Sequence, residues 1–132
     1  MESQMEVRAL DIRVKGLPPS PNAIGRSHWT IQAKNKKEWG EKIEWLAKVI
    51  KPPRPYLRAS VHFSICVGDK RRHDPDNLLA SVCKPSMDAL VRAGVLVDDS
   101  IDNIELSFDF TREGERGFNI YVEEIQEWVF KR

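Results

Sequence analysis

The sequence has few cysteines and no long apolar run. Its 132 residues include only two cysteines, Cys66 and Cys83, which form no Cys-x-x-Cys motif and have no pair of histidines nearby. This spacing argues against zinc and redox roles, and we expect both thiols to pack in the core. No apolar stretch approaches the roughly 18 residues that span a bilayer. Residues 1–4 carry neither a basic nor an apolar signal segment, so we expect a cytoplasmic protein without membrane contact.

The sequence also lacks a large net charge, and it contains no glycine-rich phosphate-binding loop of the Walker type. The net charge of +1 hides a strong asymmetry between the two parts of the chain. Residues 1–73 contain 15 Lys and Arg against 7 Asp and Glu (+8), whereas residues 74–132 contain 6 against 13 (−7). A basic segment suits a polymeric phosphate backbone better than a small nucleotide. Because the acidic part would repel DNA, we expect binding or cleavage to require a metal ion.

Composition and hydrophobic periodicity predict one domain over residues 1–132. Apolar content is 41% and charged content 31%, as in ordinary globular proteins. Apolar residues alternate over residues 10–14, 57–67, 104–110 and 118–122, which predicts strands, and helical spacing covers residues 31–50 and the segment after Asp76. We therefore predict an α/β (α+β) fold with a mixed sheet of about four strands and helices packed on it. The last two strands should form an antiparallel hairpin, and Pro85 should kink or divide the second helix.

Two pairs of aspartates stand out along the chain. Asp74 and Asp76 follow a basic segment, and Asp98 and Asp99 follow an apolar one. Carboxylate oxygens suit Mg²⁺ or Mn²⁺, and arginines beside them suit a phosphate substrate. Asp-Pro and Asp-Asp-Ser are also common in turns and helix caps, so spacing alone favours neither interpretation.

Polar and basic residues near the first pair are candidates for DNA contacts. His73 is expected either to orient its neighbours by hydrogen bonding or to be exposed. The loop over residues 16–29 is either a plain surface loop or a second contact with phosphate. The candidate DNA-binding residues are Lys70, Arg71, Arg72, Asn77, Asn22, Arg26 and His28.

Lys84 has the spacing of a residue that points toward the first carboxylates. Asp76, Ala80, Lys84 and Asp88 repeat every four residues and would share one face of a continuous helix. An ammonium there would stabilise charge on a scissile phosphate. The alternative is an ordinary Lys84–Asp88 ion pair on the surface.

Several of these segments, taken in order, resemble the RusA-type Holliday junction endonucleases, which are mostly prophage-borne. The matching segments are Leu17 to Asn22, Asp74-Pro75-Asp76-Asn77-Leu78, Lys84 to Leu90, Gly94 and Asp98-Asp99. The resemblance implies a small α/β homodimer that uses Mg²⁺ or Mn²⁺ to nick four-way DNA junctions symmetrically in recombination and repair.

The resemblance also implies roles for particular residues. Its metal carboxylates fall on Asp74, Asp76 and Asp99, with Asp98 beside them. The family's essential lysine would fall at Ala80. If this chain has four residues inserted relative to the family, Lys84 is the counterpart of the essential lysine and completes the catalytic set. The shifted lysine leaves open one alternative, a catalytically impaired protein that binds DNA junctions. A metal-dependent phosphohydrolase of small nucleotides is a second alternative, which does not depend on this lysine.

Overall fold

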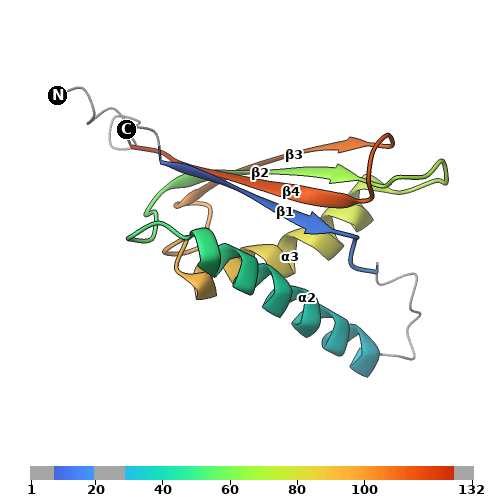
Figure 1. Cartoon of the computed structure of the whole chain (residues 1–132), viewed down its shortest axis with the longest axis horizontal. Helices are drawn as coiled ribbons and strands as arrows, with labels where there is room; N and C mark the ends of the chain where they lie inside the picture. The colour runs from blue at the N-terminus through green and yellow to red at the C-terminus, as the bar shows by residue number, and fades with distance from the viewer. Residues whose placement is uncertain (1–7, 20–28, 127–132) are drawn as a thin grey trace.

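A four-stranded sheet with two helices on one face forms a single α+β domain (Figure 1), as the sequence predicts. The computed structural model describes residues 8–19 and 29–126. The elements are β1 (Ala9–Lys15), α2 (Trp29–Ile50), β2 (Ala59–Cys66), α3 (Pro75–Ala93), β3 (Ile104–Thr111) and β4 (Gly117–Glu124). No helix in this described part of the chain is long and apolar enough to cross a membrane.

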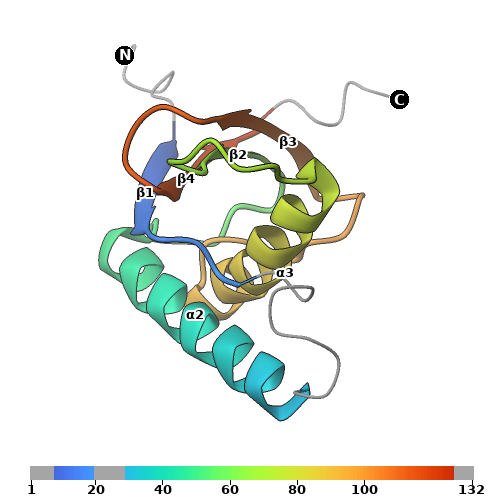
Figure 2. The same cartoon turned by 90° about the vertical axis from the view of Figure 1, so that its right-hand side faces the viewer.

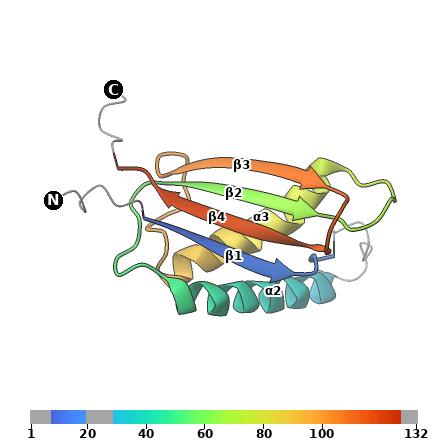
Figure 3. The ribbon, with the colours of Figure 1, turned by 45° about the horizontal axis from the view of Figure 1, so that its top comes forward.

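The sheet is mixed, with strand order β1-β4-β2-β3. β4 runs antiparallel to both of its neighbours, β1 and β2, whereas β2 and β3 are parallel. Parallel neighbours need a crossover connection, and α3 provides it by returning the chain from the end of β2 to the start of β3 (Figure 3). The segments before and after α3 therefore lie at opposite ends of the β2–β3 pair.

The predicted hairpin between the last two strands is wrong. β3 and β4 run in opposite directions, but β2 lies between them. Phe118, Ile120 and Val122 of β4 are fully buried, which suits a central strand. Leu106 and Phe108 of β3 are nearly half exposed, which suits an edge. The alternation of apolar residues predicted both strands, but it carries no information about which strands are neighbours.

The core lies between the sheet and the two helices, both of which cover the same face (Figure 2). β2 contributes Val61, Phe63 and Ile65, and α2 contributes Ile43 and Ala47. These residues follow the period of two expected for a half-buried strand and the helical spacing expected for an amphipathic helix. Cys66 is buried and Cys83 half-buried, and both are free thiols.

Pro85 lies inside one uninterrupted helix. Of the two predicted alternatives, a kink and a division into two helices, the division is therefore wrong. The α3 helix runs from Pro75 to Ala93 and ends at Gly94, whose φ of 87° is left-handed. Pro85 is buried, as are its neighbours Ser86 and Met87. Burial of this face offsets the backbone hydrogen bond that proline cannot donate. The whole stripe from Asp76 to Asp88 therefore belongs to one helix.

Candidate functional site

The residues between β2 and α3, 67–74, form a loop that we call the basic loop, and Asp69 organises it. The Asp69 carboxylate accepts hydrogen bonds from the Arg71 backbone amide at 3.0 Å and from His73 Nε2 at 2.8 Å. The bond from His73 holds the pKa of Asp69 below its ordinary value. His73 is thus the hydrogen-bonding orienter that was one of its two expected roles.

Two arginines that follow β3 hold the backbone of the basic loop. Arg112 donates from its Nη1 atom to the carbonyl oxygens of Asp69, at 3.2 Å, and Arg71, at 2.7 Å. Arg116 donates to the carbonyl oxygen of Val67 at 2.8 Å and lies 3.5 Å from the Asp69 carboxylate. The loop is therefore fixed from a second segment of the chain, which lowers the entropy cost of placing its side chains on a ligand.

The arginine side chains of the basic loop are largely exposed, although Arg71 lies 3.6 Å from the Asp69 carboxylate and Arg72 lies 3.4 Å from that of Asp74. The side chains of Arg71 and Arg72 are 78% and 89% exposed. Lys70 is exposed, and Asn77 is the third residue of α3. These four predicted DNA contacts are therefore grouped at one end of the domain, where guanidinium groups suit phosphate oxygens.

The first pair of aspartates lies at the same place. Asp74 is the N-cap residue of α3, yet its side chain makes no capping hydrogen bond. Its carboxylate lies 3.4 Å from Arg72 Nη2 and is half exposed. Asp76 is exposed in the first turn, and its carboxylate accepts a hydrogen bond only from the neighbouring Asn77 amide among the contacts described. Both carboxylates thus keep oxygen lone pairs directed at solvent, at the positive end of a helix dipole.

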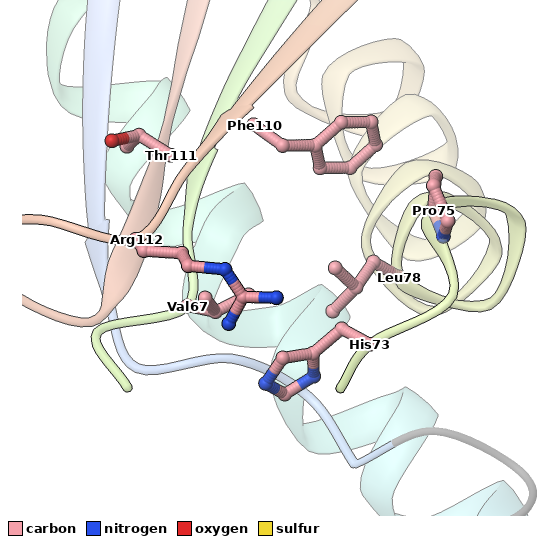
Figure 4. Close-up of a pocket in the computed structure, with 7 residues that line it drawn as sticks. All are labelled: Val67, His73, Pro75, Leu78, Phe110, Thr111 and Arg112. Atoms are coloured by element: carbon pink, nitrogen blue, oxygen red, sulfur yellow. The ribbon is translucent and has the colours of Figure 1, made fainter. Parts of the chain in front are cut away.

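An apolar pocket of about 290 Å³ opens between the start of α3 and the end of β3 (Figure 4). The Phe110 ring and the Leu78 side chain both point into it, and the Arg112 guanidinium and the His73 ring lie on its other side. The lining residues are Val67, His73, Pro75, Leu78, Phe110, Thr111 and Arg112. The basic loop therefore borders an apolar depression, a feature that the sequence did not reveal.

The second pair of aspartates lies in the loop over residues 97–103, which we call the acidic loop. It starts beside β2, where Leu96 pairs with Tyr56 and the Val97 amide donates to the Tyr56 carbonyl at 3.1 Å. Asp98 accepts a hydrogen bond from the Asp99 amide at 2.8 Å, and both side chains belong to exposed residues. The Asn103 carbonyl accepts from the Ala59 amide, which ties the end of the loop to the first residue of β2.

One chain does not bring the two aspartate pairs together. Asp74 follows the C-terminal end of β2, whereas Asp98 and Asp99 lie beside its N-terminal end. β2 has eight residues, and a strand rises about 3.3 Å per residue, so roughly 25 Å separates its ends. Within residues 8–19 and 29–126, no group of three or more His, Cys, Asp or Glu side chains could hold a metal ion.

Lys84 lies between the two pairs along α3. It forms the surface ion pair with Asp88 at 3.2 Å that was its alternative interpretation. The hydrogen bond to Asp88 raises the pKa of Lys84, and the charge of Asp99 acts in the same direction. The charge of Asp99 also contributes, after burial, to the raised pKa of Cys83. Asp99 is thus electrostatically coupled to the middle of α3, and Lys84 is an ammonium at neutral pH.

Three predicted contacts, Asn22, Arg26 and His28, lie outside the described residues. Sequence reasoning missed Asp69, Arg112 and Arg116 as supports of the basic loop. The spacing of four residues between Asp69 and His73 was a usable signal, because side chains four residues apart often hydrogen bond to each other in helices and turns. The two arginines carried no signal, because their role depends on β3 lying beside β2.

A scan against protein-family models found no match for this chain, and a search of the curated proteins found none either. The likeness to the RusA-type endonucleases therefore remains a prediction from the sequence motifs.

Proposed function

We propose that this protein is a metal-dependent endodeoxyribonuclease that nicks branched DNA, with four-way junctions as its substrate. The observation that carries the proposal is the grouping of two solvent-directed carboxylates, Asp74 and Asp76, with the exposed guanidinium groups of Arg71 and Arg72. A phosphodiester needs both: cationic groups that hold the backbone, and carboxylates that hold a divalent ion beside it.

The donor set fits Mg²⁺ or Mn²⁺. Mg²⁺ is typically held by one or two carboxylates, with waters and substrate phosphate completing its octahedron. Asp74 and Asp76 supply two such carboxylates, and Asp98 and Asp99 are the further ligands that the sequence motifs propose. When bound, the ion would lower the pKa of a water and neutralise charge on the leaving oxygen.

The protein's own residues supply the remaining tasks. Arg71 and Arg72 hold phosphates next to the scissile one, and Arg112 keeps their loop in place through two carbonyl oxygens. Lys84 carries a positive charge along the same exposed stripe of α3 that contains Asp76 and is suited to stabilise charge on the phosphate. The Arg72 guanidinium lies 3.4 Å from the Asp74 carboxylate and helps to orient it.

The test is cleavage of a labelled four-way junction, with a linear duplex of the same sequence as the control substrate. Wild type should nick the junction in paired positions when Mg²⁺ or Mn²⁺ is present, and EDTA should abolish the nicks. Asp76→Asn should lower the rate by about a thousandfold, because losing a metal ligand removes several kcal/mol of transition-state stabilisation. Asp11→Asn, on β1 and beyond the site, should cleave normally.

Four results would count against the proposal. Cleavage that persists in EDTA, or that Asp76→Asn leaves unchanged, would exclude a metal site at Asp76. Junction binding without nicks in either metal would instead indicate a DNA-binding protein with an impaired site. Hydrolysis of mononucleotides without junction binding would indicate the phosphohydrolase alternative.

A further inference from the structure

The apolar pocket beside the basic loop has walls suited to one planar ring. The Phe110 ring and the Leu78 side chain form one side of it (Figure 4). The Arg112 guanidinium and the His73 ring lie on the other side. Its volume of about 290 Å³ is near the lower limit of ligand pockets, roughly 300 Å³, so it suits a single ring system rather than a large cofactor. Aromatic faces and guanidinium planes are the surfaces on which unpaired nucleobases stack.

The polar side of this pocket has hydrogen-bonding groups that the protein itself leaves unused. Arg112 donates to two carbonyl oxygens of the basic loop from Nη1, and its Nε and Nη2 atoms have no partner among the described residues. His73 is bonded to Asp69 through Nε2, and its Nδ1 atom has no partner in the same part of the chain. An aliphatic ligand that covered these groups would leave them unpaired, which costs free energy. A nucleobase has apolar faces and an edge of nitrogen and oxygen atoms, so it matches both sides of the pocket.

The pocket is also joined to the arginines that would hold the phosphate of the same nucleotide. Val67 and His73 line the pocket and belong to the basic loop. The same loop carries Arg71 and Arg72, whose side chains are 78% and 89% exposed. Arg112 links the two features, because it lines the pocket and donates to the Arg71 carbonyl at 2.7 Å. A strand whose phosphates contact these arginines therefore has its bases next to the pocket.

We propose that this pocket binds one unpaired base of the DNA substrate, stacked on Phe110 with its polar edge against Arg112 and His73. Arg71 and Arg72 hold the adjoining phosphates. Extrusion of a base is costly inside a duplex and least costly where the base is already unpaired. The pocket therefore favours branched DNA, in which pairing or stacking is interrupted at the branch point, over a linear duplex. The choice of DNA as the ligand rests on the proposed function, but binding of the base requires no cleavage.

The test compares two four-way junctions that differ in one base. One carries a single unpaired nucleotide at the branch point, and the other carries an abasic site in its place. Binding is measured by fluorescence anisotropy in Ca²⁺, a cation that carboxylate oxygens also bind, and a gel verifies that the DNA stays intact. Wild type should bind the junction with the base about tenfold more tightly than the abasic one, because the stacking of one base on an aromatic ring is lost.

Two variants remove the pocket in different ways, and a third is the matched control. Phe110→Leu removes the ring, and Leu78→Trp fills the cavity from the other wall, so each should bind the two junctions within about twofold of each other. Phe108→Leu makes the same substitution two residues earlier on β3, at a ring 5.6 Å from that of Phe110 that does not line the pocket. It should keep the tenfold preference. Circular dichroism should show folded protein in all three.

Each failure has a distinct meaning. Equal binding of the two junctions by wild type would overturn the proposed base site, and so would a preference that both Phe110→Leu and Leu78→Trp retain. A preference that Phe108→Leu loses as fully as Phe110→Leu would place the base outside the pocket and overturn the assignment. A base preference in a protein that nicks no junction in Mg²⁺ or Mn²⁺ would overturn only the proposed cleavage. Binding to neither junction would overturn both.

Discussion

The basic loop and the acidic loop lie at opposite ends of the same parallel strand pair, and they are built differently. Arginines from another segment hold the basic loop through its carbonyl oxygens, which leaves Arg71 and Arg72 exposed. The acidic loop is tied to the start of β2 by backbone hydrogen bonds and the amide of Asn103, and it exposes aspartates and one isoleucine. One end therefore presents guanidinium groups, and the other presents carboxylates and an exposed apolar side chain.

This difference follows from the crossover connection. In a β-α-β unit with parallel strands, the segment before the helix and the segment after it must be at opposite ends of the strands. A hairpin would have put the two aspartate pairs much closer. The topology therefore separates the candidate metal ligands within one chain.

The largest difference between the two loops should appear when the two exposed arginines of the basic loop are removed. The double substitution Arg71→Ala and Arg72→Ala should weaken junction binding by about tenfold or more at moderate salt. It should also reduce the slope of log K against log salt by about 2, because two phosphate contacts are lost. Asp98→Asn, at the other end, should not weaken binding in the absence of metal. Fluorescence anisotropy over a salt series measures both the binding constant and its salt dependence. An equal slope in wild type and the double variant would show that these arginines do not contact DNA.

A smaller effect is expected at Lys84, which lies between the two ends. Lys84→Ala should slow junction cleavage about tenfold, because a charge that stabilises the transition state is lost. Asp88→Asn removes only the partner of the ion pair and should leave the cleavage rate within about twofold. The melting temperatures of both variants should equal that of wild type, since the pair is solvent-exposed. Equal, small effects of the two substitutions on cleavage would make Lys84 an ordinary surface residue.

Arg112→Ala should loosen the basic loop while leaving the acidic loop unchanged. Arg112 donates to two carbonyl oxygens of that loop, and its loss should lower the free energy of unfolding by about 1 kcal/mol. Urea denaturation measures this change. Amide hydrogen exchange should show faster exchange at Arg71 and unchanged exchange at Asn103. Faster exchange at both ends would mean that Arg112 supports the whole domain.

The smallest expected effect is the response of the basic loop to acid. Because the folded-state pKa of Asp69 lies below its ordinary value of 3.8, its hydrogen bonds contribute fully above that pH and are lost as the pH falls through the lowered pKa. The Arg71 amide, which donates to Asp69, should therefore change its NMR chemical shift with a midpoint below pH 3.8. Asp69→Asn should abolish this titration. A midpoint above 3.8 in wild type would contradict the role of His73 as the stabilising donor.

Much of the fold could be predicted from the sequence, because periodicity reports which face of an element is buried. The long alternation in β2 and the spacing of Ile43 and Ala47 in α2 correspond directly to buried positions. Strand order could not be predicted in this way. Whether β4 pairs with β3 or inserts beside β2 depends on the relative burial of two strands whose patterns look alike, and that is a property of the whole sheet.

The candidate site was predictable in composition but not in arrangement. The motifs located the aspartates and the exposed arginines, whose chemistry depends on residue type. They did not reveal that α3 continues through Pro85, that Arg112 supports the basic loop, or that Asp76 and Asp99 lie at different ends. Each of these depends on contacts between segments far apart in the chain.

The most direct test of this account is cleavage of a labelled four-way junction by carboxylate variants from both loops. Wild type should nick the junction in Mg²⁺, whereas Asp76→Asn and Asp99→Asn should each lose the nicks, because the proposed site needs carboxylates from both aspartate pairs. Asp11→Asn, on β1, should cleave as wild type does. Cleavage at the wild-type rate by Asp76→Asn would contradict the proposed metal site.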